Sequence, residues 1–434
     1  MNSFWSTFRL SELCENITDG KHGDCKDEPE SGFFFLSAKD VVAGRLLYEG
    51  ARQITEADFL ETHRRTKLEP LDILITNSGT IGRMALAPFR EKTIRTTFQK
   101  SVAIIKPQKR LVDPRFLYFL LMGRIDSLTD FAGGTAQKNL LLRDIRNFLV
   151  TIPNIVTQRR IAAVLSAYDD LIENNQRRIA ILEQIARNLY REWFVYFRFP
   201  GHEDVEIVER DGVRVPEGWG VTPLQDFGEI ITGKTPSKQV PEYFGHDMPF
   251  IKIPDMHGNM FCLDAEEGLS ELGVISQRNK TIPQNSLCVS CIGTAGLVAI
   301  TTKKSQTNQQ INSIVLNNFY LREFLYFALL DLKETIMRYG ANGATMVNLN
   351  KGKFEALQII RPQDAIALKF HEMTYSVFEQ IRAVSQKNIN LRRTRDLLLP
   401  RLVSGELDVS ELEIAGVVAS INADHVVERE EEHA

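Results

Sequence analysis

The sequence predicts an α+β protein: two similar mixed α/β domains joined by two long antiparallel coiled-coil helices, with a pseudo-twofold relation between the halves. Three observations support this prediction. The chain repeats itself with an offset of roughly 210 residues. Two long segments carry coiled-coil periodicity, and the segments before them alternate short β-rich runs with turn residues. The expected order is therefore domain, helix, domain, helix.

The repeat is visible as short matching segments in the two halves. The matched pairs are Ile17-Thr18 with Ile231-Thr232, Gly79-Thr80-Ile81-Gly82 with Gly293-Thr294-Ala295-Gly296, Phe116-Leu117-Tyr118-Phe119 with Phe324-Leu325-Tyr326-Phe327, Asn139-Leu140 with Asn348-Leu349, and Gln176-Arg177-Arg178-Ile179 with Gln386-Lys387-Asn388-Ile389. A protein built in this way presents two similar surfaces. Such a pair of surfaces suits a partner that is itself long and repetitive.

Each domain is expected to mix short strands with short helices. In the first half, Leu71–Ile75 and Ser101–Ile105 are β-rich runs bounded by Pro, Gly and Asn. A buried helix is expected over Phe116–Leu121. It begins at Asp113-Pro114, with Asp as the N-cap and proline at the first helical position. Residues 216–362 repeat this order in the second half.

Both long helices show apolar residues at alternating steps of four and three, which is typical of a coiled-coil seam. The first seam consists of Ile161, Leu165, Tyr168, Ile172, Ile179, Leu182, Ala186, Leu189 and Trp193, and the second of Phe370, Val377, Ile381, Val384, Leu391, Leu398 and Leu402. Pro400 is expected to end or kink the second helix.

The two helices are expected to bury each other's seams, and connectivity then makes them antiparallel. The first helix leads from one domain to the next, so a paired second helix must run back. Asn175 and Asn388 interrupt the seams and would restrict the register of the pair. The alternative is two separate helices, each packed on its own domain.

Composition limits the possible classes of protein. A chain of 434 residues fits two to three domains. Its net charge of −4 is not that of a polycation, although local basic stretches can still steer a nucleic acid. The clearest basic stretch contains Arg90, Lys92, Arg95, Lys100, Lys106, Lys109 and Arg110. Five irregularly spaced cysteines, no secretory signal and no long apolar run predict a cytoplasmic protein without a membrane span.

Two short motifs are open to a catalytic or metal-binding interpretation, and neither is favoured. Gly228–Thr235 fits the P-loop pattern, which would make the chain an NTPase, but Pro236 follows directly where a helix should begin. Cys288 and Cys291 form a CxxC pair without a second pair nearby, so small buried strand residues are the better interpretation. The sequence contains no other arrangement that indicates catalysis.

Polar and basic residues instead recur at loop-like positions of both halves. Gln, Asn, Thr, Arg and Lys are the side chains that contact base edges and phosphates, so their recurrence predicts DNA contact. The candidate residues are Lys21, Lys39, Asn77, Ser78, Thr80, Arg83, Thr97, Gln99, Lys100, Lys234, Lys252, Thr294, Asn308 and Gln309. Thr97, Gln99 and Lys100 correspond roughly to Thr307, Asn308 and Gln309.

The chain resembles the specificity (S) subunits of type I restriction–modification systems across essentially its whole length. The residues that carry the resemblance are Gln158-Arg-Arg-Ile-Ala-Ala-Val-Leu-Ser-Ala-Tyr-Asp-Asp-Leu-Ile in the first helix, Arg395-Asp-Leu-Leu-Leu-Pro-Arg-Leu-Val-Ser-Gly-Glu-Leu in the second, and Gly233-Lys-Thr-Pro-Ser. The first half lacks a Gly-Lys-Thr-Pro-Ser segment. The resemblance divides the chain into a first target-recognition domain (1–153), a central helix (154–199), a second target-recognition domain (200–362), a distal helix (363–405) and an acidic tail (406–434).

The resemblance also implies a function and a set of partners. Each target-recognition domain would read one half of a split double-stranded DNA sequence. The helices would bind two modification (M) subunits, which use S-adenosylmethionine to methylate adenine, and restriction (R) subunits, which use ATP and Mg²⁺, would join them. This chain would hold no cofactor and perform no catalysis. A specificity chain of a type IIB-like enzyme, the NTPase and a coiled-coil adaptor without DNA contact are the alternatives.

Overall fold

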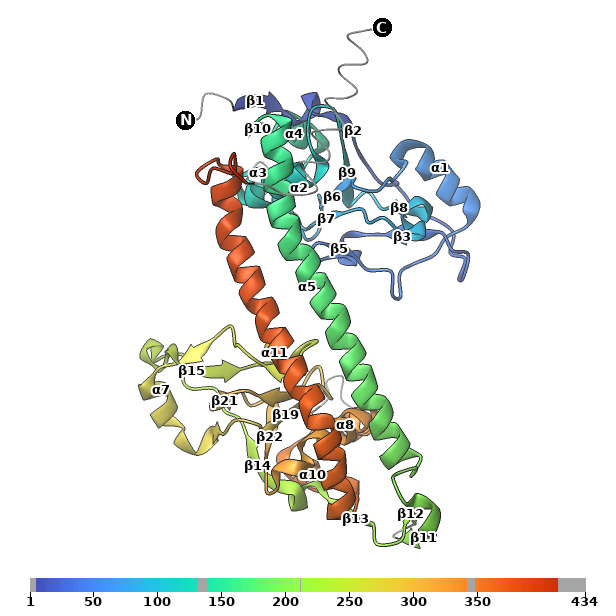
Figure 1. Cartoon of the computed structure of the whole chain (residues 1–434), viewed down its shortest axis with the longest axis vertical. Coiled ribbons are helices and arrows are strands. Elements are labelled where there is room, and N and C mark those ends of the chain that lie inside the picture. Colours follow the sequence, from blue (N-terminus) through green and yellow to red (C-terminus); the bar gives the residue numbers. More distant parts are fainter. Residues whose placement is uncertain (1–4, 131–138, 211, 342–347, 413–434) are drawn as a thin grey trace. The chain divides into compact units, whose positions relative to one another are not determined.

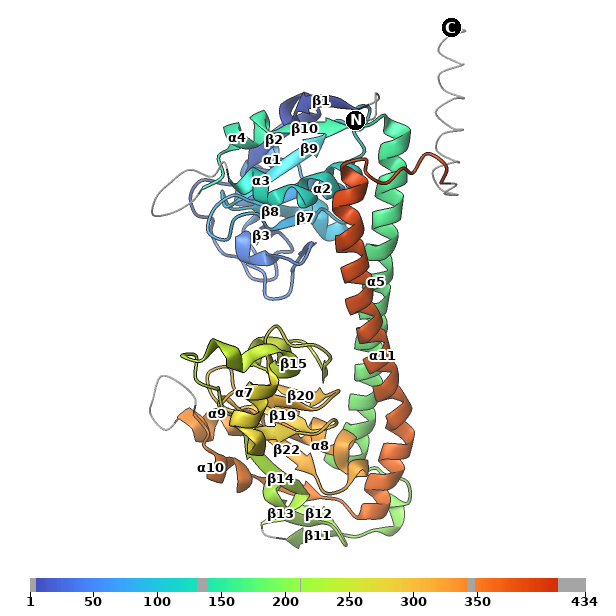
Figure 2. The ribbon, with the colours of Figure 1, turned by 90° about the vertical axis from the view of Figure 1, so that its left-hand side faces the viewer.

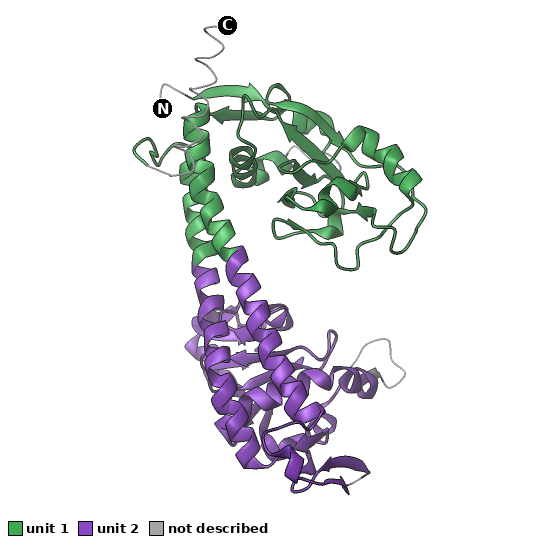
Figure 3. Ribbon diagram, turned by 45° about the vertical axis from the view of Figure 1, so that its right-hand side comes forward, with its two compact units in different colours: residues 1–172, 391–434 green, residues 173–390 purple. Residues whose placement is uncertain are grey.

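The computed structural model describes residues 5–130, 139–210, 212–341 and 348–412. The chain divides into two compact units (Figure 3). The first unit comprises Met1–Ile172 and Leu391–Ala434, and the second comprises Glu173–Asn390. Each unit contains one mixed α/β domain together with segments of the long helices α5 (Ile155–Tyr190) and α11 (Asp364–Val403), which Figure 1 shows.

The domain of the first unit is built on an antiparallel sheet with the strand order β2-β9-β6-β7. Its strands are β2 (Cys14–Asp19), β9 (Val102–Pro107), β6 (Ile73–Thr76) and β7 (Met84–Leu86). A parallel pair, β3 (Phe34–Leu36) with β8 (Thr96–Phe98), lies beside it, and β1 (Ser6–Arg9) pairs with β10 (Leu149–Ile152). The remaining elements are β4 (Val41–Val42), β5 (Arg45–Leu46), α1 (Glu56–Thr66), α2 (Pro114–Gly123), α3 (Ile125–Thr129) and α4 (Leu142–Asn147).

The core of this domain follows from its apolar runs. Every residue of β6 is buried, as expected for a strand that is covered on both faces. Helix α2 starts as predicted, because the Asp113 side chain accepts hydrogen bonds from the amides of Arg115 (3.0 Å) and Phe116 (2.9 Å). Its apolar residues pack against the sheet and against both long helices.

The domain of the second unit follows the same plan. Its main sheet has the order β14-β22-β19-β20-β16, formed by β14 (Gly228–Thr232), β22 (Ile311–Leu316), β19 (Leu287–Ser290), β20 (Val298–Thr301) and β16 (Phe261–Cys262). The counterpart of the β3–β8 pair is β15 (Phe244–Ile251) parallel to β21 (Ser305–Thr307), extended by β17 (Gly268–Leu269) and β18 (Thr281–Ile282). Helix α8 (Arg322–Asp331) lies between the sheet and the long helices (Figure 2).

The other elements of the second unit complete the correspondence. Strand β13 (Gly220–Pro223) pairs with β23 (Gln358–Arg361), as β1 pairs with β10. The helices are α6 (Ile253–Met256), α7 (Glu271–Ser276), α9 (Lys333–Ala341) and α10 (Lys351–Glu355), and a hairpin of β11 (Ile207–Arg210) and β12 (Val213–Pro216) precedes the domain. The prediction of two similar mixed domains is confirmed.

Recurring hydrogen bonds define the register of the repeat. The Lys21 amide donates to Phe98 O (2.7 Å) and the Lys234 amide donates to Thr307 O (2.9 Å), so these two pairs correspond. The predicted match of Ile17 with Ile231 is therefore wrong by one residue, because Ile17 corresponds to Ile230. Likewise Thr97 corresponds to Gln306 rather than to Thr307. Because Ile230 and Ile231 are adjacent, the sequence aligns Ile17 equally well with either of them.

The segments of α5 and α11 lie side by side and antiparallel in each unit (Figure 1 and Figure 2). In the second unit Asn175 Nδ2 donates to Asn388 Oδ1 (2.8 Å), and the Trp193 ring contacts the Phe370 ring near the other end of the pair. In the first unit Arg395 pairs with Asp169. The antiparallel arrangement is confirmed, and separate helices are not observed.

The ends of the long helices differ slightly from the predicted ones. Helix α5 begins at Ile155, one residue after the predicted bound at 154, and passes into a π-helical turn over Arg191–Val195. Pro400 does not end α11, which continues to Val403. Proline removes one hydrogen bond to the carbonyl four residues earlier, and α11 ends three residues after Pro400, so little of the helix depends on that bond.

Candidate nucleic-acid interface

A hollow of about 450 Å³ in the first unit collects four of the residues predicted to contact DNA. Four segments meet there: the turn after β3, the loop between β6 and β7, the turn between β8 and β9, and the segment at Asn139. The lining residues are Ser37, Ala38, Lys39, Ser78, Gly79, Gln99, Lys100, Ser101 and Asn139. We call this hollow the recognition groove. Its polar side chains come from segments far apart in the sequence.

Hydrogen bonds donated by backbone amides hold the first three of these segments together. The Gln99 amide donates to Leu36 O (2.8 Å), and the Asn77 amide donates to Ser101 O (3.0 Å). The Ala38 amide donates to the Ser101 hydroxyl (3.3 Å). Because main-chain groups form most of this frame, the side chains at its surface can vary without loss of the fold.

The loop between β6 and β7 is shaped by one buried threonine and two glycines. The Thr76 hydroxyl donates to Thr80 O and accepts from the Arg83 amide (2.9 Å). Gly79 and Gly82 adopt positive φ angles of 75° and 87°, which other residues rarely adopt. Ser78, Thr80 and Arg83 lie on the outside of this loop, where Thr80 and Arg83 are exposed.

The second unit repeats this loop with different residues. The Ser290 hydroxyl donates to Thr294 O (2.6 Å) and accepts from the Leu297 amide (2.9 Å), so Ser290 takes the place of Thr76. Thr294 is exposed, as its counterpart Thr80 is. The Asn308 amide donates to Ile251 O (3.2 Å), which makes Asn308 the counterpart of Gln99. The second unit therefore presents the same loops, with Gln309 exposed where the first unit has Lys100.

Three predicted residues are buried rather than presented to solvent. Thr97 is completely buried in β8, with its hydroxyl 3.4 Å from that of Thr66. Asn77 is also buried, and Asn308 lies largely inside, where its side-chain amide donates to Gln310 Oε1 (3.0 Å). The structure places none of these three side chains at the surface of the predicted interface. Polar and apolar residues do not alternate regularly in the segments that contain these three residues. The sequence therefore did not indicate that their side chains are buried.

Two predicted lysines are held by carboxylates. Lys21 Nζ donates to Asp58 Oδ1 (2.9 Å) and Glu61 Oε2 (3.1 Å) on α1. Lys252 pairs with Glu267 and lies over the Phe250 ring. Lys252 also follows β15 where Ser37 follows β3, so it is the counterpart of Ser37 and not of Lys39. The correspondence rests on one shared contact: the amides of Ser37 and Lys252 each donate to the aspartate three residues on (2.8 Å in both).

Other predicted cations form no ion pair with the residues that the structure describes. Lys39 and Lys100 of the first unit and Lys234 of the second are exposed, and none forms an ion pair within the described part of the chain. The basic stretch of the first half is not one surface, because Lys106 binds Asp72 (2.6 Å) and Lys92 lies over the Phe34 ring (5.2 Å). The positive charge at the recognition groove therefore comes from Lys39 and Lys100.

The P-loop-like and CxxC motifs have structural roles. Gly228–Thr232 is strand β14, and the Thr235 hydroxyl after it donates to Gln309 Oε1 (2.6 Å) instead of beginning a helix. Cys288 and Cys291 are buried at β19, and burial raises the pKa of both thiols to about 12. Among the described residues, no group of His, Cys, Asp or Glu side chains could hold a metal ion. No described helix is long and apolar enough to cross a membrane.

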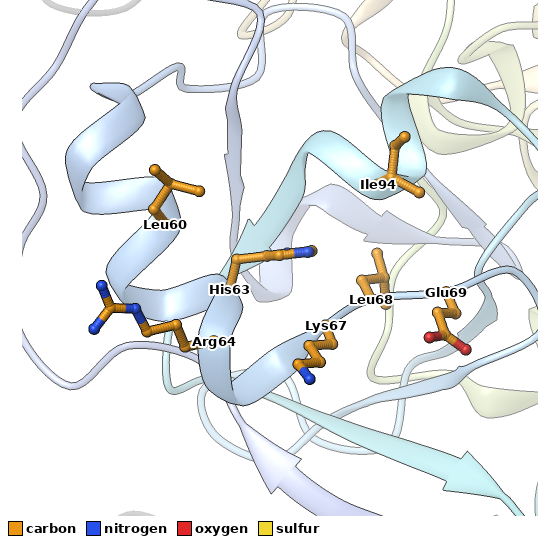
Figure 4. A pocket seen from close by; sticks show the side chains of 7 residues that line it. All are labelled: Leu60, His63, Arg64, Lys67, Leu68, Glu69 and Ile94. Carbon is orange, nitrogen blue, oxygen red and sulfur yellow. The ribbon is translucent and has the colours of Figure 1, made fainter.

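A second hollow in the first unit, about 430 Å³, lies beside α1 (Figure 4). Leu60 and His63 of α1 face Leu68 and Ile94 across it, with Arg64, Lys67 and Glu69 at its edge. The His63 ring stacks on the Phe59 ring (4.7 Å), and burial lowers the pKa of His63. None of the residues predicted to contact DNA lines this hollow.

Sequence reasoning missed part of the recognition groove. Ser37, Ala38, Ser101 and Asn139 line it but were not predicted. Asn139 could have been found, since the Asn-Leu pair recurs at Asn348 and the leucine amide after each asparagine binds the preceding loop. Leu140 donates to Asn77 O and Leu349 to Cys291 O, both at 2.9 Å.

Two similar units, each with the same polar loops on an α/β domain, define a protein with two copies of one recognition module. Type I restriction modification DNA specificity domains match residues 2–184 and 216–384. The chain belongs to this family and is a type I restriction–modification specificity subunit with two target-recognition domains.

The relatives agree with this assignment, and one solved structure shows the same fold. The type I restriction enzyme HindI specificity subunit of Haemophilus influenzae is 34% identical, covering 93% of this chain and 100% of that protein. The MjaIX specificity subunit of Methanocaldococcus jannaschii is 30% identical over 87% of each chain. The crystal structure of an S subunit from M. genitalium shares the fold with a TM-score of 0.57 at 14% identity, covering 93% of this chain and 97% of that one.

Proposed function

We propose that each unit reads one half of a bipartite double-stranded DNA sequence through the loops that form the recognition groove and its counterpart. The observation that carries this proposal is the groove itself, where Lys39, Ser78, Gln99 and Lys100 meet. The same backbone frame recurs in the second unit around Thr294, Asn308 and Gln309. Two copies of one frame with different side chains are what two different half-sites require.

The chemistry of these side chains divides them into two roles. Gln99 is half-buried and lines the groove. Gln and Asn side chains distinguish adenine by donating to and accepting from its base edge, and this role suits Gln99. Lys39 and Lys100 are cations without ion pairs in the described structure, and they suit phosphates. Ser78, Thr80 and Arg83 of the first unit, with Thr294 and Gln309 of the second, complete the proposed contacts.

The proposal extends to partners and location. Two M subunits would bind along α5 and α11, where Ile181, Ile185 and Leu397 are apolar and exposed. R subunits would join this complex in the cytoplasm. S-adenosylmethionine, ATP and Mg²⁺ would be held by those partners, and this chain would supply recognition without a catalytic step.

The test compares Lys100→Gln with Lys109→Gln in the complex of this chain with M subunits. Lys109 is an exposed lysine beyond the far end of β9, so it serves as a matched control. The DNA carries the sequence that the complex methylates. The affinity of the complex for this DNA is measured as a function of salt concentration. Lys100→Gln is expected to reduce the slope of log affinity against log salt by about 0.9, the value for one phosphate contact. An unchanged slope for Lys100→Gln, or no preference of the wild-type complex for its methylated sequence, would contradict the proposal.

A further inference from the structure

The same Gly-Lys turn occurs once in each unit, in the same backbone setting. A Cβ atom on Gly20 would lie 2.0 Å from Phe98 O, and one on Gly233 would lie 2.2 Å from Asn308 O. Only glycine allows so close an approach of the two backbones. The lysine after each glycine therefore starts from an equivalent position beside the interface loops.

The Lys21 side chain is used inside the first unit. Its ammonium group bridges Asp58 and Glu61 of α1, and only 15% of the side chain is exposed. Asp58 also accepts from the Lys26 amide (2.8 Å), so the carboxylate joins the turn to the start of α1. The hydrogen bond that Lys21 donates to Asp58 raises the pKa of Lys21, and the charge stays within this cluster.

The second unit lacks both carboxylates. Thr55 caps α1 and Ser270 caps α7 in the same way, which makes Gly273 the counterpart of Asp58 and Ser276 the counterpart of Glu61. The Ser276 hydroxyl donates to Gly273 O (2.6 Å) in its own helix. Lys234 consequently stays exposed and forms no ion pair among the described residues.

Beside the Gly-Lys turn, the exposed cation comes from a different loop in each unit. In the first unit it is Lys100, in the turn between β8 and β9, whose amide donates to Lys21 O (3.1 Å). The counterpart of Lys100 is the neutral Gln309. In the second unit Gln309 accepts a hydrogen bond from the Thr235 hydroxyl, next to Lys234. Each unit thus has an exposed cation where the Gly-Lys turn meets the turn before β9 or β22. The cation comes from the second of these turns in the first unit and from the Gly-Lys turn in the second unit.

We infer that the two equivalent lysines have different roles: Lys234 contacts a DNA phosphate, whereas Lys21 is a positioning residue that fixes α1 and the Gly-Lys turn beside the recognition groove. This inference rests on the proposed DNA function. It goes beyond that function because it divides one repeated motif into a binding copy and a structural copy. The division follows from the two carboxylates of α1 and not from the motif itself.

The experiment measures the salt slope of DNA binding for the complex of the chain with M subunits. Lys234→Gln is expected to lower the slope by about 0.9 and to weaken binding to all half-site sequences alike. Lys21→Gln is expected to leave the slope unchanged and to reduce the discrimination between correct and altered first half-sites. Lys21→Arg, which can still bridge both carboxylates, is expected to restore that discrimination. The control is Lys304→Gln, an exposed lysine of the second unit that lies between β20 and β21.

A transplanted carboxylate gives an independent test that does not remove a lysine. Gln277 Nε2 donates to Lys234 O (2.8 Å), so the end of α7, where Ser276 is the last residue, lies beside the Gly-Lys turn. Ser276→Glu is expected to pair with Lys234 and to lower the slope by about 0.9, as Lys234→Gln does. The position of Gly273 is unsuitable because a Cβ there would lie 2.0 Å from Tyr243 O.

The outcomes separate this inference from the proposed function. A wild-type complex that binds target and scrambled DNA equally well would overturn the proposed function. If the wild-type complex is selective, an equal loss of slope in Lys21→Gln and Lys234→Gln would overturn the inference alone. So would an unchanged slope in both Lys234→Gln and Ser276→Glu.

Discussion

The two units attach their domains to the long helices by different chemistry at the same place. In the first unit a neutral side chain does this: Gln158 of α5 is buried, accepts from the Asp113 amide (2.8 Å) and donates to Pro153 O (2.9 Å). These bonds tie the start of α5 to the start of α2. Every polar atom involved is uncharged or belongs to the backbone.

The second unit uses buried charges at the corresponding end of α8. Arg322 and Glu323 are buried and bonded to each other (2.6 Å), and His371 of α11 binds the second oxygen of Glu323 (2.7 Å). Arg322 also donates to Asn285 Oδ1 (2.8 Å) and lies over the Phe319 ring (4.6 Å). The same fold thus accommodates a neutral attachment in one unit and a charged attachment in the other. It requires that buried polar groups have hydrogen-bond partners, and it does not require a particular charge.

The largest expected difference between the units comes from breaking the charged attachment. Glu323→Ala would take the nearer carboxylate from both Arg322 and His371 and leave Arg322 only the more distant Glu379 (3.6 Å). Removing one partner of a buried pair costs about 3–5 kcal/mol. Hydrogen exchange of β19 and β22 would measure the loss in the second unit, with β6 and β9 of the first unit as the internal control. The double variant Arg322→Met/Glu323→Leu is expected to recover most of the stability. A loss below about 1 kcal/mol for Glu323→Ala would contradict the importance of the pair.

A smaller effect is expected from breaking the neutral attachment. Gln158→Ala removes the partners of the Asp113 amide and of Pro153 O, and an unsatisfied buried group costs about 1–3 kcal/mol. The same exchange experiment should now show the loss in β6 and β9, while β19 and β22 stay protected. An equal loss in both units would mean that the two attachments do not act separately.

The fold could be predicted because its signals are local or repeated. The Asp113-Pro114 pair started α2 where expected, and the seams of α5 and α11 marked the two helices. The glycine pairs at Gly79 and Gly293 located equivalent loops. Each of these signals is contained within a few neighbouring residues or appears twice at the same offset.

The site could be predicted only in part, because its charges depend on distant residues. Lys21 and Lys234 look alike in sequence, yet Asp58 and Glu61, which hold Lys21, lie 37 and 40 residues away. Glu267 neutralises Lys252 in the same way. The burial of Thr97 depends on the position of β8 inside the domain, and pattern alone does not show it.

The smallest expected difference between the units is in the titration of the Asp58 carboxyl on α1 at acid pH. The Lys21 hydrogen bond and the Lys26 amide lower the pKa of Asp58 to about 2. Because this pKa lies below the ordinary value, the contact between the turn and α1 is complete above about pH 4 and is lost as pH falls through about 2. In α7, Gly273 takes the place of Asp58, so no such loss is expected there.

Carboxyl NMR of the Asp58 side chain would measure this titration, with Asp24 as the matched control. Arg52 lowers the pKa of Asp24 independently of Lys21. Lys21→Met is expected to raise the pKa of Asp58 toward its ordinary value and to leave that of Asp24 in place. If Lys21→Met left the Asp58 midpoint near 2, the Lys26 amide alone would account for the shift. Lys21 would then hold α1 more weakly than the geometry of the ion pair implies. The proposed difference in role between Lys21 and Lys234 would be correspondingly smaller.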